Sequence, residues 1–290
     1  MRIRVALCLV LFCYVSHAQN IRLVDSLRRQ LPKASPTKQV ELMNAIGFEF
    51  RYSFPDSTIY YCQRAYDLGK QLQLKKELSK PLSFIGLAYA NKGDYKNSFT
   101  YHHESIDVAI SQNDSVQLAF GYNNLGRMFF DQGDLVRAYD NFIRAKDIFE
   151  ALDEKPGLAY VYRSLANIHA SQKDFANALA MSRTAYDLRR TMGDPRMIIS
   201  SLMELGLIQE ASGDAAGALS SFLKADSLSD KAHDPVTEAE LNVGLAEILL
   251  AEGKLEEAYE RANEVQKIVS ASTNQKLFLR ARQVQADYYY

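Results

Sequence analysis

The chain has 290 residues, of which 47% are hydrophobic and 24% are charged, a composition typical of a globular protein with a large core. Its 34 basic and 35 acidic side chains leave a formal charge of −1. This balance excludes a bulk attraction to nucleic acid or to an anionic membrane surface, so we expect no nucleic acid partner.

Residues 1–18 have the pattern of a secretory signal peptide. Arg2 and Arg4 precede an apolar run over residues 5–15, which is short for a membrane helix, and residues 16–18 (SHA) form a small-x-small cleavage site. Cleavage would leave Gln19 as the first residue and 32 basic against 35 acidic side chains, a charge of −3. We therefore expect an exported, periplasmic protein.

The cysteines argue against two alternatives. A lipoprotein signal is less favoured, because the bulky Leu7 and Phe12 precede Cys8 and Cys13 where a lipid-attachment site needs a small residue. Removal of the signal leaves only Cys62, so an internal disulfide is excluded. Past residue 18 no apolar run is long enough for a membrane helix.

From residue 37 the sequence repeats every 40 residues. A Gly-Asp pair at residues 93–94 recurs at 133–134 and 213–214, as Gly-Lys at 253–254, and as Lys-Asp at 173–174. We number each copy so that this glycine is position 15. Five copies then agree: positions 7 and 30 are apolar, position 20 is Ala or Ser, position 27 is Ala, Ser or Val, and position 8 is small. Position 8 is held by Gly86, Gly126, Ala166, Gly206 and Ala246.

This spacing predicts a helical hairpin in each copy. Positions 4, 7, 8 and 11 share one helix face, as do 20, 24 and 27, and the small residues at 8 and 20 allow two antiparallel helices to approach closely. Gly-Asp would end the first helix and start the second, and Asp114 and Asp194 would cap the next hairpin. We expect helix pairs near residues 77–112, 117–152, 157–192, 197–231 and 236–270.

Weaker copies flank these five. Residues 19–36 are expected to form an N-terminal helix or lead-in. A degenerate pair near residues 37–72 places Thr58, Cys62, Ala65 and Leu68 at positions 20, 24, 27 and 30. At the other end, residues 288–290 (YYY) fall inside the first helix of a seventh copy. Since a solenoid ends in a polar capping helix, we expect the chain to be a fragment or the array to continue.

The third copy carries a family resemblance. It resembles the tetratricopeptide repeat in six residues: Tyr122, Leu125, Gly126, Phe129, Ala138 and Phe142. The likeness covers roughly residues 37–290. The period of 40 exceeds the usual 34 and position 32 lacks the usual proline, as in a longer-helix variety. Armadillo and HEAT repeats share the length but lack the Leu-Gly and Ala-x-x-x-Phe pairing.

The resemblance implies an all-α fold, an α-solenoid of antiparallel helix pairs in a right-handed superhelix. About six repeats and a truncated seventh are expected. The units would span about 39–76, 77–116, 117–156, 157–196, 197–236, 237–276 and 277–290 of an array at residues 37–290.

No catalytic motif or cofactor site is apparent, so we expect this segment not to be an enzyme and to bind no cofactor or metal. His102 at position 24 and His169 at position 11 are expected to pack or to lie on a polar surface, since further metal ligands do not converge on them. Cys62 is expected to fill space; a redox role is the alternative.

Binding is the remaining function. In tetratricopeptide arrays the first helices line the concave face through positions 2, 5, 9, 12 and 13. Carried over to the third and fourth units, these slots give a candidate groove of Asn123, Arg127, Phe130, Tyr160, Arg163 and Asn167. Arginines with amides could hold an acidic protein or peptide segment. The alternative is a solvated polar face. The fifth and sixth units contribute Met203, Leu207, Glu210, Glu240 and Glu247.

An exported array of this kind resembles the N-terminal sensory region of bacterial signalling proteins, such as tetratricopeptide-repeat sensor histidine kinases. In these proteins a membrane helix and a kinase or DNA-binding output domain follow the repeats. A membrane contact is expected only through such a further helix. The alternative is a stand-alone exported scaffold or adaptor.

Overall fold

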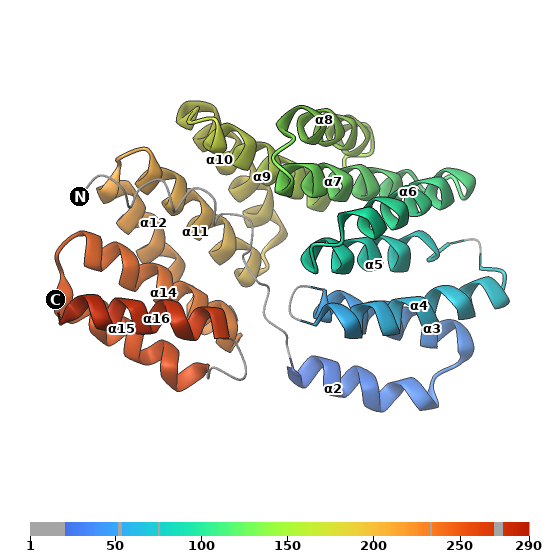
Figure 1. Ribbon diagram of the computed structural model, residues 1–290, viewed down its shortest axis with the longest axis horizontal. Coiled ribbons are helices and arrows are strands. Elements are labelled where there is room, and N and C mark those ends of the chain that lie inside the picture. The colour runs from blue at the N-terminus through green and yellow to red at the C-terminus, as the bar shows by residue number, and fades with distance from the viewer. Residues whose placement is uncertain (1–20, 52–53, 75, 233, 270–274, 290) are drawn as a thin grey trace. The chain divides into compact units, whose positions relative to one another are not determined.

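The computed structural model describes residues 21–51, 54–74, 76–232, 234–269 and 275–289, and its regular elements are all helices (Figure 1). The predicted signal peptide lies outside the described residues. The helices are α2 (Ile21–Gln30), η2 (Leu31–Lys33), α3 (Pro36–Phe50), α4 (Pro55–Gln71), α5 (Ser79–Asn91), α6 (Tyr95–Ser111), α7 (Ser115–Asp131), α8 (Leu135–Ala151), α9 (Lys155–Ser171), α10 (Phe175–Met192), α11 (Pro195–Ala211), α12 (Ala215–Asp226), α13 (Ser229–Ala232), α14 (Pro235–Ala251), α15 (Leu255–Ile268) and α16 (Gln275–Tyr288).

The chain divides into two compact units between Ile168 and His169, within α9. In the N-terminal unit successive helices from α3 to α8 pack against one another, and in the C-terminal unit those from α10 to α12 and from α14 to α16 do so. In chain order the described helices make up six successive pairs followed by α16. The predicted all-α solenoid of helical hairpins is confirmed, including the weaker first pair, which is α3 and α4.

The Gly-Asp pair makes the turn within the second, third and fifth hairpins as predicted. Gly133 has a φ of 79°, in the left-handed region where glycine is favoured, and ends α7. The carboxylate of Asp134 then accepts a hydrogen bond from the backbone N–H of Arg137 at 2.9 Å, which caps α8. The fourth hairpin makes the same turn with Lys173 at a φ of 61°.

The small residue at position 8 lies against the residue at position 24 of the paired helix. A Cβ on Gly126 would lie 2.7 Å from the ring of Phe142, and one on Gly206 would lie 2.6 Å from the ring of Phe222. The ring of His102 lies against Gly86 in the same way. In the sixth repeat both positions are alanine, Ala246 and Ala262, and both belong to one buried cluster.

The first repeat follows the same rule with a different register. Gly47 lies against Cys62, although a strict 40-residue period would place position 8 at Ile46. The contacting residues Gly47 and Cys62 are 15 residues apart, whereas Gly86 and His102 are 16 apart, so the first helix is displaced by one residue relative to the second. Cys62 is fully buried, and burial raises the pKa of its thiol, which keeps the sulfur protonated and unreactive.

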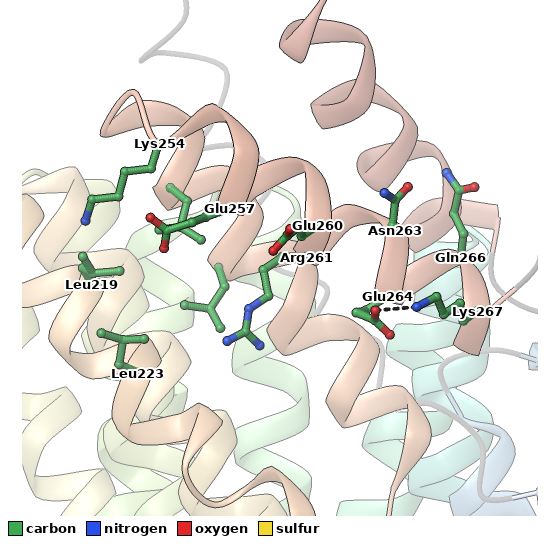
Figure 2. A pocket seen from close by; sticks show the side chains of 12 residues that line it. Leu219, Leu223, Lys254, Glu257, Glu260, Arg261, Asn263, Glu264, Gln266 and Lys267 are labelled. Carbon is green, nitrogen blue, oxygen red and sulfur yellow. Dashed lines mark hydrogen bonds and ion pairs between the residues drawn. The ribbon is translucent and has the colours of Figure 1, made fainter.

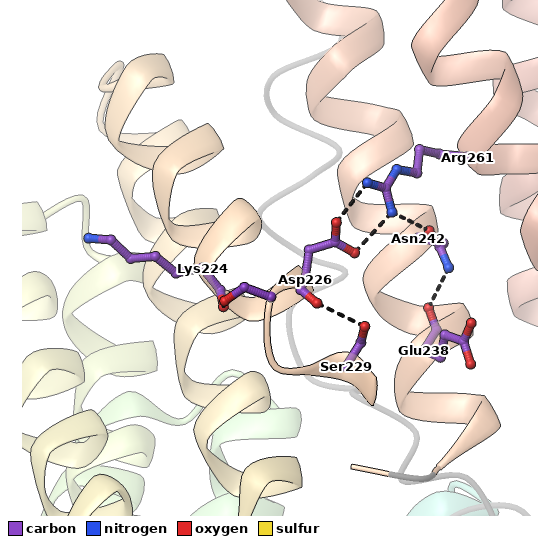
Figure 3. Close-up of polar contacts among 7 residues, drawn as sticks. Lys224, Asp226, Ser229, Glu238, Asn242 and Arg261 are labelled. Carbon is purple, nitrogen blue, oxygen red and sulfur yellow. Dashed lines mark hydrogen bonds and ion pairs between the residues drawn. The ribbon is translucent and has the colours of Figure 1, made fainter. Parts of the chain in front are cut away.

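The second helix of the fifth repeat is interrupted. The helix pair expected near residues 197–231 is present, but α12 ends at Asp226 and the short helix α13 follows it. The carboxylate of Asp226 is held by Arg261 of α15 at 2.7 and 2.9 Å, and its carbonyl accepts a hydrogen bond from the hydroxyl of Ser229 at 2.8 Å (Figure 3). The helix therefore stops where its last residue is bound to the next repeat.

The predicted lead-in contains helix α2, which packs on the first repeat. Val24 is buried in a cluster with Ile46 and Phe50. The guanidinium of Arg28 lies 5.2 Å from the ring centroid of Phe50, and its Nε donates to the hydroxyl of Tyr61 at 3.1 Å. This helix covers apolar surface of the first repeat.

Candidate peptide-binding surface

The six candidate groove residues all lie in the N-terminal unit, on the first helices α7 and α9. Spacings of four and three residues place Asn123, Arg127 and Phe130 along one side of α7. Spacings of three and four do the same for the three residues of α9, which are Tyr160, Arg163 and Asn167.

Asn123 is the most buried of the six, with 4% of its surface exposed. Its Oδ1 accepts a hydrogen bond from the hydroxyl of Ser164 at 3.3 Å, which joins α7 to α9. On the other side of α7, Asn124 donates to the hydroxyl of Ser83 of α5 at 2.7 Å. Small polar side chains thus fasten α7 to both neighbouring first helices. Asn123 has little surface left for a ligand.

The other five residues are half-buried, between core and solvent. The guanidinium of Arg163 lies 5.7 Å from the ring centroid of Tyr160, within cation–π range. The ring of Phe120 lies edge-on to Tyr160 at 6.2 Å and to Phe149 at 4.9 Å. A guanidinium beside aromatic rings on successive helices can accept a carboxylate or an extended segment with apolar side chains.

Arg127 lies close enough to His102 to act on its ionisation. Burial is the largest cause that lowers the pKa of His102 to about 3, and the positive charges of Arg127 and His103 lower it further. His102 is fully buried and stays neutral at physiological pH, as its predicted packing role requires. His169 is partly buried instead, with its Nδ1 at 3.1 Å from Oδ2 of Asp174.

The slots of α11 and α14 in the C-terminal unit carry acidic side chains instead. Glu247 of α14 forms a two-pronged ion pair with Arg280 of α16, at 2.5 and 2.9 Å. Burial, and then the charge of Glu247, raise the pKa of Glu210 in α11. Met203 is buried and Leu207 is half-buried. In the third to sixth repeats the positive side chains at these slots are therefore those of α7 and α9.

Sequence reasoning missed the contacts that set these burials. Ser164, which binds Asn123, lies at position 6, a slot that the resemblance assigns to no surface. The sequence feature that could have indicated these contacts is the recurrence of Asn or Ser at positions 5 and 6, in Ser83, Asn124 and Ser164. Among the described residues no group of three or more His, Cys, Asp or Glu side chains could hold a metal ion. None of the described helices is long and apolar enough to cross a membrane.

Comparison with known proteins supports the repeat type. Residues 117–191 match the family model described as tetratricopeptide repeat. No curated protein matches the chain significantly.

Solved structures of low sequence identity share the fold. The chain is similar to a signal transduction ATPase with numerous domains from Pyrococcus horikoshii, which has a tetratricopeptide repeat sensor, at 15% identity and a TM-score of 0.66 over 93% of this chain and 39% of that one. It thus spans well under half of that protein. It is also similar to a Rap protein complexed with competence and sporulation factor, at 15% identity and a TM-score of 0.62 over 92% of this chain and 70% of that one.

A third structure is similar over a shorter part. BtubC from P. vanneervenii has 19% identity and a TM-score of 0.53 over 72% of this chain and 88% of that one. At these identities the likeness concerns the fold alone.

Proposed function

We propose that this chain of tetratricopeptide repeats is a non-catalytic interaction module. Its N-terminal unit binds an acidic protein or peptide segment. The observation that carries this proposal is the surface of α7 and α9, where half-buried Arg127 and Arg163 lie among Tyr160, Phe130 and Asn167. Charged hydrogen bonds from guanidinium groups to carboxylates are about twice as strong as neutral ones.

The charge of the C-terminal unit supports the choice of an acidic ligand. The corresponding slots of α11 and α14 carry Glu210, Glu240 and Glu247 and no arginine, so they offer no guanidinium to a carboxylate. The Rap protein among the structural neighbours is complexed with a factor, and the Pyrococcus protein uses its repeats as a sensor. Both are instances of this fold in recognition.

The test is a binding measurement with a labelled Glu-rich decapeptide and a Lys-rich decapeptide of equal length. Arg127→Ala combined with Arg163→Ala should weaken binding of the Glu-rich peptide at least tenfold, because truncating one partner of a partly buried charged contact costs ~2–5 kcal/mol. The melting temperature should change little.

The matched control is Arg144→Ala combined with Arg183→Ala, which removes two exposed arginines from α8 and α10. It lowers the net charge equally and should leave binding of the peptide unchanged. If all variants bound the Glu-rich peptide equally, or if both double variants lost the same affinity, Arg127 and Arg163 would only be part of a solvated polar face.

We further propose that the module works in the periplasm as the sensory region of a bacterial signal-transduction protein. The support is the signal-like segment of residues 1–18 together with the sensor role of the repeats in the Pyrococcus protein. The competing function is an exported scaffold or adaptor. The DNA sequence downstream of the codon for Tyr290 separates the two, since a sensor requires a membrane helix and a kinase or DNA-binding domain.

A further inference from the structure

A groove separates the second helices of the fifth and sixth repeats, α12 and α15, within the C-terminal unit (Figure 2). It has a volume of about 870 Å³. Leu219 and Leu223 of α12 form one wall, residues of α15 and its N-cap Lys254 form the other, and Leu245 and Leu249 of α14 also line the groove. We call it the α12–α15 groove.

The groove has an apolar side that is open to solvent. Leu223 is 49% exposed, and Leu219 precedes it by one helical turn on the same face of α12. A second hollow of about 550 Å³ is also lined by these two leucines, so they form a ridge between two depressions. An exposed apolar ridge inside a depression favours an apolar ligand.

Contacts across three helices fix the walls relative to one another. Arg261 of α15 binds the carboxylate of Asp226 at the end of α12 and donates to Oδ1 of Asn242 in α14 at 3.0 Å (Figure 3). Since α12 has 12 residues where α8 has 17, its wall ends at this contact. The groove is thus pre-formed, which spares a ligand the cost of opening it.

The α15 wall carries three carboxylates and three cations, and pairing of Arg261 and Lys267 leaves Lys254 against Glu257 and Glu260, a small excess of negative charge. Arg261 is neutralised by Asp226, and Glu264 is paired with Lys267 at 2.6 Å. Glu257 and Glu260 are exposed, and neither forms an ion pair with another described residue. They lie three residues apart, on neighbouring turns of the helix. A ligand seated on the leucine ridge would therefore meet two negative charges at its edge.

The shape fits a helix. The α15 wall covers 14 residues, from Lys254 to Lys267, which is about 20 Å at ~1.5 Å per residue. Two helices lying side by side leave the kind of furrow that the side-chain ridge of a third helix fills. We propose that the α12–α15 groove binds an amphipathic helix of a partner protein, with its apolar stripe on Leu219 and Leu223 and its Lys or Arg side chains against Glu257 and Glu260.

The probes are two labelled 18-residue helical peptides with the same leucine stripe at spacings of three and four, one flanked by lysines and one by glutamates. Fluorescence anisotropy with the full chain carrying Arg127→Ala and Arg163→Ala, which removes the surface proposed to bind acidic segments, should show the lysine peptide binding at least tenfold more tightly. Leu223→Glu should weaken that binding at least tenfold. Glu257→Lys combined with Glu260→Lys should reverse the preference between the peptides.

Two controls localise the binding. Val136→Glu places the same charge on an exposed apolar position of α8, where the side chain is 76% exposed, and should leave binding unchanged. Arg127→Ala with Arg163→Ala should also leave it unchanged, which separates this groove from the surface proposed on α7 and α9. The proposal would be overturned if the lysine peptide did not bind. It would also be overturned if the Leu223→Glu and charge-reversed proteins bound that peptide as tightly as the protein with the groove unchanged.

Discussion

Gly126 in α7 lies directly against the ring of Phe142 in α8, so closely that a Cβ on the glycine would approach Cε1 of the ring to 2.7 Å and the carbonyl oxygen of Ala138 to 3.1 Å. Phe142 is 1% exposed and Ala138 is fully buried. Neither neighbour can withdraw easily, because one fills the core and the other belongs to the backbone of α8.

Gly126→Leu should therefore destabilise the third repeat by about 1–3 kcal/mol, the usual cost of overpacking a core. Since repeats contact mainly their neighbours, amide exchange should rise first in α7 and α8. Ala176→Leu, at an exposed position of α10, serves as the control and should leave exchange unchanged. Uniform loss of protection in every repeat would contradict this account.

The same contact shows why so much of the fold could be predicted. The rule at position 8 is local and recurs, so five copies of the sequence record one geometry five times. The Gly-Asp turns are equally local, because the left-handed glycine and the capping aspartate act within four residues. Helix pairs were predictable wherever the determinants lay inside one hairpin.

Features set by distant residues could not be predicted. Ala225 and Leu228 continue the apolar spacing of the fifth repeat, yet α12 ends at Asp226, which is bound to Arg261 35 residues later. Position 5 placed Asn123 among the groove residues, but its burial depends on Ser164 of the next repeat. The prediction for the remaining groove residues stays a prediction until binding is measured.

His102 should make the protein sensitive to mild acid. It occupies the position of Phe142 and Phe222, is fully buried, and neither ring nitrogen has a hydrogen-bond partner among the described residues. Its pKa falls from 6.5 to about 3 through burial first, with smaller effects of Arg127 and His103. Below pH 6.5 the imidazole of His102 is protonated in the unfolded chain but stays neutral in the folded chain. The free energy of unfolding therefore decreases as the pH falls from 6.5 toward 3.

The measurement is the free energy of unfolding at pH 7 and pH 5 for the wild type and His102→Phe. Each pH unit below the unfolded pKa costs about 1.4 kcal/mol for one such group, so the wild type should lose about 2 kcal/mol more than the variant by pH 5. The phenylalanine also removes two buried polar atoms without partners. Parallel pH profiles for the two proteins would show that His102 does not carry the effect.

Replacing Lys173 with glycine should increase the stability of the fourth repeat. It has a φ of 61° at the turn where Gly133 has 79°, and a side chain with a Cβ pays for the left-handed conformation. Lys173→Gly should stabilise the fourth repeat by about 1 kcal/mol in denaturant titrations. Gly133→Lys is the matched reverse change, since a Cβ there meets no atom within 4 Å and only backbone strain is added. The hypothesis fails if both changes alter stability in the same direction.

The pair of Arg261 and Asp226 should contribute more than an ordinary surface ion pair. The two side chains are 32% and 27% exposed and meet through two hydrogen bonds, whereas Lys38 and Glu41 meet through one at 56% and 47% exposure. A double-mutant cycle with Arg261→Gln and Asp226→Asn should give a coupling free energy of about 1 kcal/mol, at the upper end for exposed pairs. The same cycle with Lys38→Gln and Glu41→Gln should give about 0.3 kcal/mol, and molar salt should reduce it further.

Because Arg261 also contacts Asn242, Arg261→Lys keeps the charge but loses the two-pronged geometry and should recover less than half of the coupling. Equal coupling in both cycles would mean that the end of α12 is set by its own sequence and not by its contact with α15.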